Sequence, residues 1–152
     1  MQKTMVILGL FSFLFKTTQV EAQTSNNNKT VLITGAASGI GKATAIQFVK
    51  KGYNTYATDK DTSNMQELAK WGCKIKYVDV TIDSVMVEAV KEIETETGGI
   101  DVLVNNAGFG QNGVIEELSI DKIRKQFEVN VFGLIRMTQL VLPKMRERKS
   151  AE

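Results

Sequence analysis

The sequence is poor in the residues that metal centres, disulfide scaffolds and many hydrolases need. Its 152 residues include no histidine, a single cysteine (Cys73) and a single proline (Pro143). Without histidine, the usual zinc ligand and the Ser-His-Asp triad are both excluded. One cysteine can form neither an intrachain disulfide nor a cluster of thiolate ligands. We therefore expect no metal site and no triad hydrolase.

The sequence also has little excess charge of either sign. Nineteen lysines and arginines stand against 17 aspartates and glutamates, for a formal net charge of +2. This near balance gives no reason to expect a nucleic-acid partner. The composition, 43% apolar and 24% charged, is ordinary for one globular domain. Cys73 and the one tryptophan, Trp71, are predicted to be packing residues.

The longest apolar run, residues 5–15, lies near the amino terminus. A membrane span needs about 20 apolar residues, so this run is too short to cross a bilayer. Residues 20–22 suit a signal peptidase, which predicts a signal peptide over residues 1–22 with cleavage after Ala22. The alternatives are a membrane anchor acting through residues 5–15, a buried N-terminal helix, and a misread start codon.

A signal peptide or anchor predicts a protein of the secretory pathway, in the ER lumen or associated with a membrane. A misread start would predict a cytoplasmic protein instead. Polar residues 23–29 are predicted to be a linker, followed by a domain over residues 30–152. Asn28 begins a glycosylation sequon, but the strand expected next to it leaves the transferase little room.

From residue 30 onward, short apolar runs alternate with helical patterns. Strands are expected at residues 31–34, 55–58, 75–80 and 102–105, and helices at 42–51, 65–71, 84–97 and 119–148. Such alternation predicts right-handed crossovers and a parallel sheet covered by helices on both faces. The expected fold class is α/β, a doubly wound parallel sheet that stops after its fourth strand and the long helix that follows.

Several helix details are also predicted. Ser63 is expected to cap the second helix. The apolar spacing predicts that Val87, Val90 and Ile93 are buried in the third helix, and Ile123, Phe127 and Leu134 in the fourth. Pro143 is expected to bend the last turns of the fourth helix.

Residues 34–41 (TGAASGIG) join the first strand to the first helix and contain three glycines. Gly35 allows a tight turn, Gly39 lets the backbone approach a pyrophosphate, and Gly41 removes a side chain where helix packs on strand. The loop's N–H groups and the helix N-terminus then face the anion, and the Ser38 hydroxyl can donate to phosphate or cap the helix. Taken alone, the cluster could also be a purely structural turn.

Asp59 ends the second expected strand. A carboxylate there can accept hydrogen bonds from both ribose hydroxyls of NAD. It would repel the 2′-phosphate of NADP, by about 4 kcal/mol for charges about 4 Å apart at an effective dielectric of 20, and by less where exposed. Lys60 can offset that repulsion, and the alternative role of Asp59 is a solvated turn residue. NAD is therefore the favoured cofactor, with NADP as the alternative.

Four motifs in this order resemble the N-terminal half of the short-chain dehydrogenase/reductase family. They are residues 34–41, Asp79-Val80, residues 105–108 (NNAG) and Asn130 within FEVNV, and the resemblance covers about residues 30–149. It implies a Rossmann-type fold and a nucleotide site made by Gly35, Ser38, Gly39, Ile40, Gly41, Asp59, Asp79, Val80, Asn106, Ala107 and Gly108.

Individual roles also follow from the resemblance. Asp79 would hydrogen-bond the adenine amino group beside the Val80 backbone, and residues 106–108 would line the adenine ribose. Asn130 would belong to the catalytic tetrad, where its backbone carbonyl holds a water of the proton relay. Without the family, Asn130 is better interpreted as an interior hydrogen-bonding residue. The implied substrate is a small-molecule alcohol or carbonyl compound, with residues 129–145 similar to the branch that acts on retinoids, steroids and acyl-glycerone phosphates.

The family's catalytic Ser and helical Tyr-x-x-x-Lys lie beyond a fifth strand, so the chain is expected to be an N-terminal fragment that lacks them. Tyr56 and Lys60 have the same spacing. In a helix that spacing spans about 6 Å, but in the strand expected here it spans about 13 Å, so Tyr56 is excluded as the catalytic tyrosine.

Three hypotheses follow. The chain is part of an NAD-linked oxidoreductase whose full-length form is a homo-oligomer, or it binds nucleotide without turnover, or it is a non-catalytic dimerisation partner. The first is favoured because the fourth strand, residues 102–104, would otherwise be an unpaired apolar edge that promotes aggregation.

Overall fold

The computed structural model describes residues 29–149. The predicted signal peptide or anchor, most of the predicted linker and Asn28 of the sequon lie outside these residues. In chain order the elements are β1 (Thr30–Thr34), α1 (Gly39–Lys50), β2 (Asn54–Asp59), α2 (Gln66–Trp71), β3 (Lys74–Tyr77), α3 (Asp83–Thr97), β4 (Val102–Val104), the 3₁₀ turn η1 (Ile115–Glu117), α4 (Ile120–Phe127), the π-helical turn η2 (Glu128–Gly133) and α5 (Leu134–Arg148).

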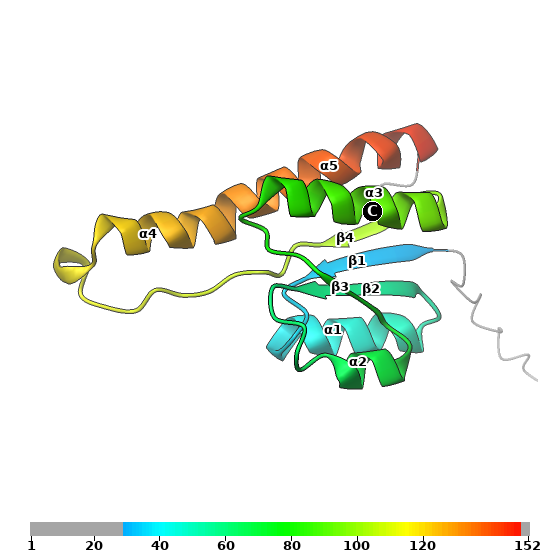
Figure 1. Ribbon diagram of the computed structural model, residues 1–152, viewed down its shortest axis with the longest axis horizontal. Helices are drawn as coiled ribbons and strands as arrows, with labels where there is room; N and C mark the ends of the chain where they lie inside the picture. Colours follow the sequence, from blue (N-terminus) through cyan, green and yellow to red (C-terminus); the bar gives the residue numbers. More distant parts are fainter. Residues whose placement is uncertain (1–28, 150–152) are drawn as a thin grey trace, which may run out of the picture.

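The strands form one parallel sheet in the order β3-β2-β1-β4. Helices α1 and α2 cover one face, and α3 and α5 cover the other (Figure 1). The predicted doubly wound α/β fold with a parallel sheet is therefore confirmed. Among the described residues β4 pairs only with β1, so β4 is an edge strand, as expected.

Two apolar cores lie on the two faces because side chains alternate along β1. Val31 and Ile33 pack with α1 and α2, together with Leu68 and Cys73. Leu32 points the other way, into a core shared by α3 and α5. Burial raises the pKa of the Cys73 thiol to about 11, so at neutral pH Cys73 is an apolar packing residue, as predicted.

The structure corrects several predicted details. Ser63 does not cap α2, because its N–H and its hydroxyl both donate to the Asp61 carboxylate in a local turn. The third strand ends at Tyr77, where its partner β2 ends, and not at Val80. Trp71 is not a packing residue: at the end of α2 it is 45% exposed.

The buried stripe of α3 also differs from the prediction. Val90 and Ile93 are buried as expected, but Val87 is 38% exposed. The residues that complete the buried face are Met86 and Ala89, which lie at i, i+3, i+4 and i+7 with the other two.

The predicted helix 119–148 is interrupted by η2 at Glu128–Gly133. Phe127 and Leu134, predicted to be buried, are 52% and 41% exposed. Two causes explain this: α4 projects past the sheet (Figure 1), and the extra residue of a π-helical turn rotates the face that follows it. Beyond η2 the buried residues of α5 are Met137, Val141 and Met145, and the helix continues through Pro143 to Arg148.

An ion pair with a buried carboxylate fastens the end of α5 to the start of β1. Asp101 is 5% exposed, and its carboxylate accepts hydrogen bonds from the Thr30 N–H at 2.7 Å and from Arg148 Nη2 at 2.8 Å. A Cβ on Gly99 would lie 2.3 Å from Arg148 Nη1, so the arginine passes directly over a glycine backbone. This clamp fixes the end of the molecule at which the parallel strands begin.

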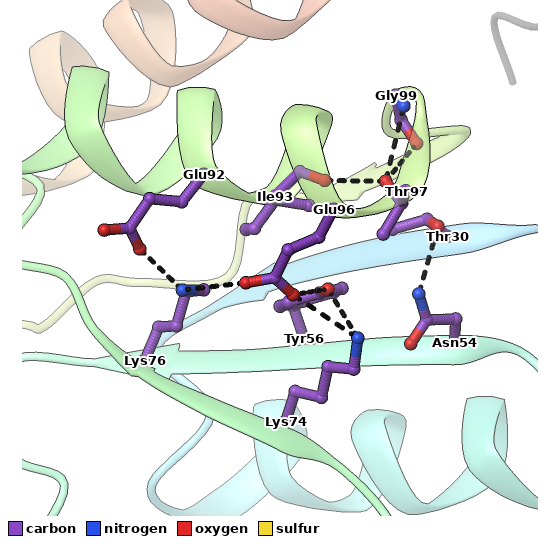
Figure 2. A network of polar contacts seen from close by, with 10 residues as sticks. All are labelled: Thr30, Asn54, Tyr56, Lys74, Lys76, Glu92, Ile93, Glu96, Thr97 and Gly99. Atoms are coloured by element: carbon purple, nitrogen blue, oxygen red, sulfur yellow. Dashed lines mark hydrogen bonds and ion pairs between the residues drawn. The ribbon is translucent and has the colours of Figure 1, made fainter.

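A polar network joins α3 to β2 and β3 (Figure 2). Tyr56 donates its hydroxyl hydrogen to Glu96 at 2.6 Å and accepts from Lys74 Nζ at 2.8 Å, while Lys76 pairs with Glu92 at 2.6 Å. Burial, followed by the bond to Glu96, raises the pKa of Tyr56. Tyr56 is therefore a buried strand residue, and the lysine that binds its hydroxyl is Lys74 and not Lys60. The spacing of Tyr56 and Lys60 in the sequence does not correspond to a catalytic pair.

No helix within residues 29–149 is long and apolar enough to cross a membrane.

Candidate nucleotide-binding site

A pocket of about 500 Å³ lies where the carboxyl ends of the strands meet the following loops. This is the edge at which open α/β sheets bind ligands. Its walls come from the loop after β1, the end of β2, the segment after β3, the loop after β4 and one residue of η2. The lining residues are Gly35, Ser38, Gly39, Ile40, Asp59, Lys60, Val78, Asp79, Val80, Asn106, Ala107, Gly108, Phe109 and Val129.

The three glycines of the first loop have different surroundings. Gly35 has φ +67°, and a Cβ there would lie 2.7 Å from the Ala107 Cα. A Cβ on Gly41 would lie 2.3 Å from the Gly35 carbonyl oxygen, so Gly41 supports the loop from behind and does not line the pocket. Gly39 has φ +54° and no atom within 4 Å of a Cβ position. Of the three, Gly39 is the one that leaves open space beside the pocket.

The N-terminus of α1 begins directly after this loop. Ser38 occupies the N-cap position, but its side chain makes no capping hydrogen bond. The first N–H groups of a helix have no partner inside the helix, and together with the helix dipole they favour an anion. The loop can therefore offer backbone N–H groups and the Ser38 hydroxyl to a phosphate.

Asn106 fastens the first loop to the end of β4. Its side-chain amide donates to the carbonyl oxygens of Thr34 at 3.1 Å and Gly35 at 2.8 Å. In return, the Thr34 hydroxyl oxygen accepts from the N–H groups of Asn106 and Ala107, both at 3.1 Å. Asn106 thus shapes the pocket by holding the glycine loop. Thr34, which belongs to the predicted loop motif but was not predicted as a site residue, supports the loop as well.

Asp59 lies in the pocket wall, at the end of β2. One carboxylate oxygen accepts from the Ala37 N–H and the other from the Asp61 N–H, both at 3.0 Å. The residue therefore has the turn role considered as its alternative, and it holds the glycine loop as well. A carboxylate offers about four acceptor positions, so two hydrogen bonds leave Asp59 able to accept from a ligand in the pocket.

Asp79 lines the pocket beyond β3. Its Oδ1 accepts from the Thr81 N–H at 2.9 Å and from the Thr81 hydroxyl at 2.7 Å. Partial burial favours the neutral carboxyl, but these two hydrogen bonds and the charges of Lys60 and Lys125 outweigh it, so the pKa of Asp79 is lowered. Asp79 is an anion at neutral pH and can accept a hydrogen bond from an amino group.

Asn130 does not line the pocket but holds the loop that does. Its side-chain Nδ2 donates to the Phe109 carbonyl at 2.8 Å, and its Oδ1 accepts from the Phe109 N–H at 3.0 Å. A Cβ on Gly108 would lie 3.2 Å from the same Oδ1. The side chain of Asn130 therefore has the interior hydrogen-bonding role that its residue type suggests.

The pocket thus brings together ten of the predicted site residues and leaves Gly41 and Asn130 behind its wall. Phe109, Val78 and Val129 also line it and were not predicted. Apolar residues at these positions carry no signal that separates them from core residues. Within the described part of the chain, no group of three or more Cys, Asp or Glu side chains could hold a metal ion.

Comparisons with known proteins agree with one another. The family model described as short chain dehydrogenase matches residues 29–152. The 3-ketodihydrosphingosine reductase of Bacteroides thetaiotaomicron is 38% identical over 78% of this chain and 43% of its own length. Human retinol dehydrogenase 8 is 35% identical over 80% of this chain and 41% of its own length.

Solved structures show the same similarity. A short-chain dehydrogenase from Streptomyces avermitilis superimposes with a TM-score of 0.75 at 37% identity, covering 81% of this chain and 46% of the other. The ligand-free aldohexose dehydrogenase of Thermoplasma acidophilum gives a TM-score of 0.70 at 32% identity, over 78% and 45% of the two chains. This chain spans about half the length of the curated relatives it matches.

Proposed function

This chain belongs to the short-chain dehydrogenase family, a family of oxidoreductases, and we propose that its pocket binds the adenosine diphosphate half of NAD. The observation that carries the proposal is the loop at residues 34–41. Its glycine backbone leaves open space at Gly39, and it leads into a helix N-terminus without a side-chain cap. Such a site suits a pyrophosphate.

The remaining pocket residues fit the other parts of the nucleotide. Asp59 would accept hydrogen bonds from the ribose hydroxyls, and Asp79 from the adenine amino group. Asn106, Ala107 and Gly108 would line the ribose side. The Asp59 carboxylate would oppose the 2′-phosphate of NADP, and exposed Lys60 would reduce that opposition. We therefore propose NAD as the preferred cofactor and NADP as the weaker one.

When bound, the nicotinamide would supply hydride transfer between its ring and an alcohol or carbonyl substrate. The part of this chain's residues is to bind and orient the nucleotide, with Asn130 fixing the Phe109 backbone at the pocket wall. The described residues place no tyrosine in the pocket. We accordingly propose that the proton-transfer residues, and most of the substrate site, are not among residues 29–149.

We propose an apolar substrate of the lipid, retinoid or steroid kind. Support comes from two relatives at 35% identity or more, named for a sphingoid ketone and for retinol. A relative named for an aldohexose, at 32% identity, represents the competing polar class.

A second role, as a partner in an oligomer, is supported by the surface of α4, η2 and α5. Phe127, Phe132 and Ile135 are each 45% exposed or more on this surface. Large apolar side chains gathered on one helical surface favour packing against another protein surface. We propose that it packs against a second copy of the protein, so sedimentation analysis should detect a homo-oligomer.

Isothermal titration of the 152-residue chain with NAD, NADP and ADP-ribose tests the nucleotide proposal. We expect weak, saturable binding, with NAD and ADP-ribose equal in affinity because the pocket contacts only their shared half. Gly39→Ala should weaken both by at least about tenfold, because its Cβ would occupy the space left for the pyrophosphate.

Gly98→Ala is the matched control. Gly98 also has positive φ (+81°) and no atom within 4 Å of a Cβ position, but it lies at the opposite end of the molecule, after α3. The two variants share a backbone cost of about 1–2 kcal/mol. Equal binding by both variants, or no binding by the wild-type chain, would contradict the proposal.

A further inference from the structure

The end of the molecule opposite the pocket carries many basic residues. In a parallel sheet with crossover helices, the helices end where the strands begin, so α1, α2, α3 and α5 all end at this edge (Figure 1). Exposed basic residues stand at the ends of three of them. These residues, together with Trp71, form what we call the amino-end face: Lys50, Lys51, Lys70, Trp71, Arg146 and Lys149.

Three acidic side chains at this edge are already paired. Glu96 pairs with Lys74 at 3.4 Å, Glu147 with Lys144 at 3.1 Å, and buried Asp101 with Arg148 at 2.8 Å. Among the described residues, the five basic residues of the amino-end face take part in no ion pair. The helix dipole favours a cation at the C-terminus of each helix. Five unpaired basic residues at one edge nevertheless give this edge a positive surface.

The tryptophan of this face contacts one of its lysines. Lys50 Nζ lies 4.9 Å from the centroid of the Trp71 ring, which is 45% exposed at the end of α2. An exposed indole beside lysine stems is the combination that lies at membrane interfaces, where the ring meets the headgroups and the ammonium groups meet phosphate.

The amino-end face is also where the N-terminal segment joins the domain. The Lys29 carbonyl accepts a hydrogen bond from the Asn54 N–H at 3.0 Å, beside the start of β1 and the residues that follow α1. The 28 residues before it include the apolar run at 5–15, long enough to enter one leaflet but not to cross a bilayer.

From these observations we propose that the amino-end face docks on the surface of an anionic lipid bilayer. Lysines and arginines near such a surface are attracted to its phosphate and carboxylate groups, and an apolar segment nearby adds a second anchoring signal. The orientation has a consequence for the pocket, which lies at the opposite end of the sheet. Docking by this face leaves the pocket open to the aqueous phase.

Trp71 reports directly on this contact because it is the only tryptophan in the chain. The full chain is titrated with vesicles of phosphatidylcholine containing about 30% phosphatidylserine, and with phosphatidylcholine alone. We expect a blue shift of Trp71 emission, and quenching by brominated lipid, only with the anionic vesicles. Added salt should reduce the response.

Lys51→Glu/Lys70→Glu tests the face while keeping Lys50 beside the indole. Each lysine near an anionic surface contributes about fivefold in partitioning, so the double variant should bind at least about 25-fold more weakly. Lys91→Glu/Lys122→Glu is the matched control, since these exposed lysines lie on α3 and α4, away from the face. Circular dichroism establishes that each variant is folded.

Four results would overturn the proposal. They are no Trp71 response to anionic vesicles, an equal response to neutral vesicles, an equal loss in the control variant, and a response to duplex DNA in place of vesicles. The second would assign membrane binding to the apolar run alone, and the fourth would assign the face to a nucleic acid.

Discussion

At the scale of single residues, the site depends on polar side chains that hydrogen-bond to the backbone of its loops, and on glycines that let these loops approach one another. Asn106, Asn130 and Asp59 each bind two backbone groups of neighbouring loops. The backbone groups that these three side chains bind all lie at the edge where the strands end. The pocket wall is therefore assembled by hydrogen bonds from segments far apart in the sequence.

The glycine loop and Asp59 could be predicted from the sequence because their spacing reflects local geometry, with a strand before the loop and a helix after it. The hydrogen bonds of the Asn130 side chain to the loop after β4 could not be predicted. Its partner, Phe109, is 21 residues away, and only the three-dimensional fold brings the two together. Trp71 was misassigned for a related reason, since composition does not reveal that α2 ends at the surface.

Asp59→Asn should shift nucleotide preference toward NADP. The change removes the charge that opposes a 2′-phosphate, and it keeps an acceptor for the Ala37 N–H. We expect the ratio of NADP to NAD affinity to rise by at least about tenfold, measured by isothermal titration. Asp61→Asn is the control, because it removes one negative charge two residues after Asp59, at a residue that does not line the pocket. An equal change in both variants would show a general charge effect and contradict the role given to Asp59.

At the scale of elements, α5 and α3 pack against each other on one face of the sheet (Figure 1). The strands and most helix ranges could be predicted because their apolar periods are strong. The division of the last helix by η2 could not, since a π-helical turn adds one residue without a distinct pattern. A Cβ on Gly133 would lie 2.7 Å from the Val80 carbonyl oxygen, so this turn approaches the pocket segment after β3 closely.

The packing of α3 on α5 includes an unfavourable charge. Glu94 Oε1 is buried and, among the described residues, has no hydrogen-bond partner. Burial raises the pKa of Glu94, the charges of Lys144 and Arg148 lower it, and Glu147 raises it. A raised pKa in the folded state means that stability is lost as pH rises through the ordinary glutamate range and the raised value.

Glu94→Gln should therefore stabilise the protein at neutral pH, by about 1 kcal/mol or less, and should lose this advantage near pH 4. Urea unfolding at both pH values measures the difference. Glu88→Gln, an exposed change on the same helix, should alter the free energy of unfolding by no more than a few tenths of a kcal/mol. A gain at pH 7 that persists unchanged at pH 4 would rule out the titration of Glu94 as the cause.

At the scale of the whole molecule, the two ends of the sheet differ in chemistry. The carboxyl end holds the pocket with Asp59 and Asp79, and the amino end holds the basic amino-end face. Along one side runs β4, an edge strand of apolar residues without lysine or proline to protect it. The parallel sheet could be predicted because strands and helices alternate along the sequence, whereas the strand order β3-β2-β1-β4 is known only from the structure.

The 152 residues by themselves should associate through the exposed β4 edge. Dynamic light scattering should show particle size rising with concentration at low micromolar levels. A monomer with one sharp, cooperative thermal transition would contradict this expectation.

The central claim, that the pocket binds the adenosine diphosphate half of a dinucleotide, is tested most directly by amide hydrogen exchange with and without saturating ADP-ribose. This measurement tolerates weak affinity and low protein concentration. We predict slower exchange in peptides covering residues 35–41, 59–61 and 78–80, with no change in the amino-end face. Unchanged exchange at residues 35–41 under saturating nucleotide would contradict the account.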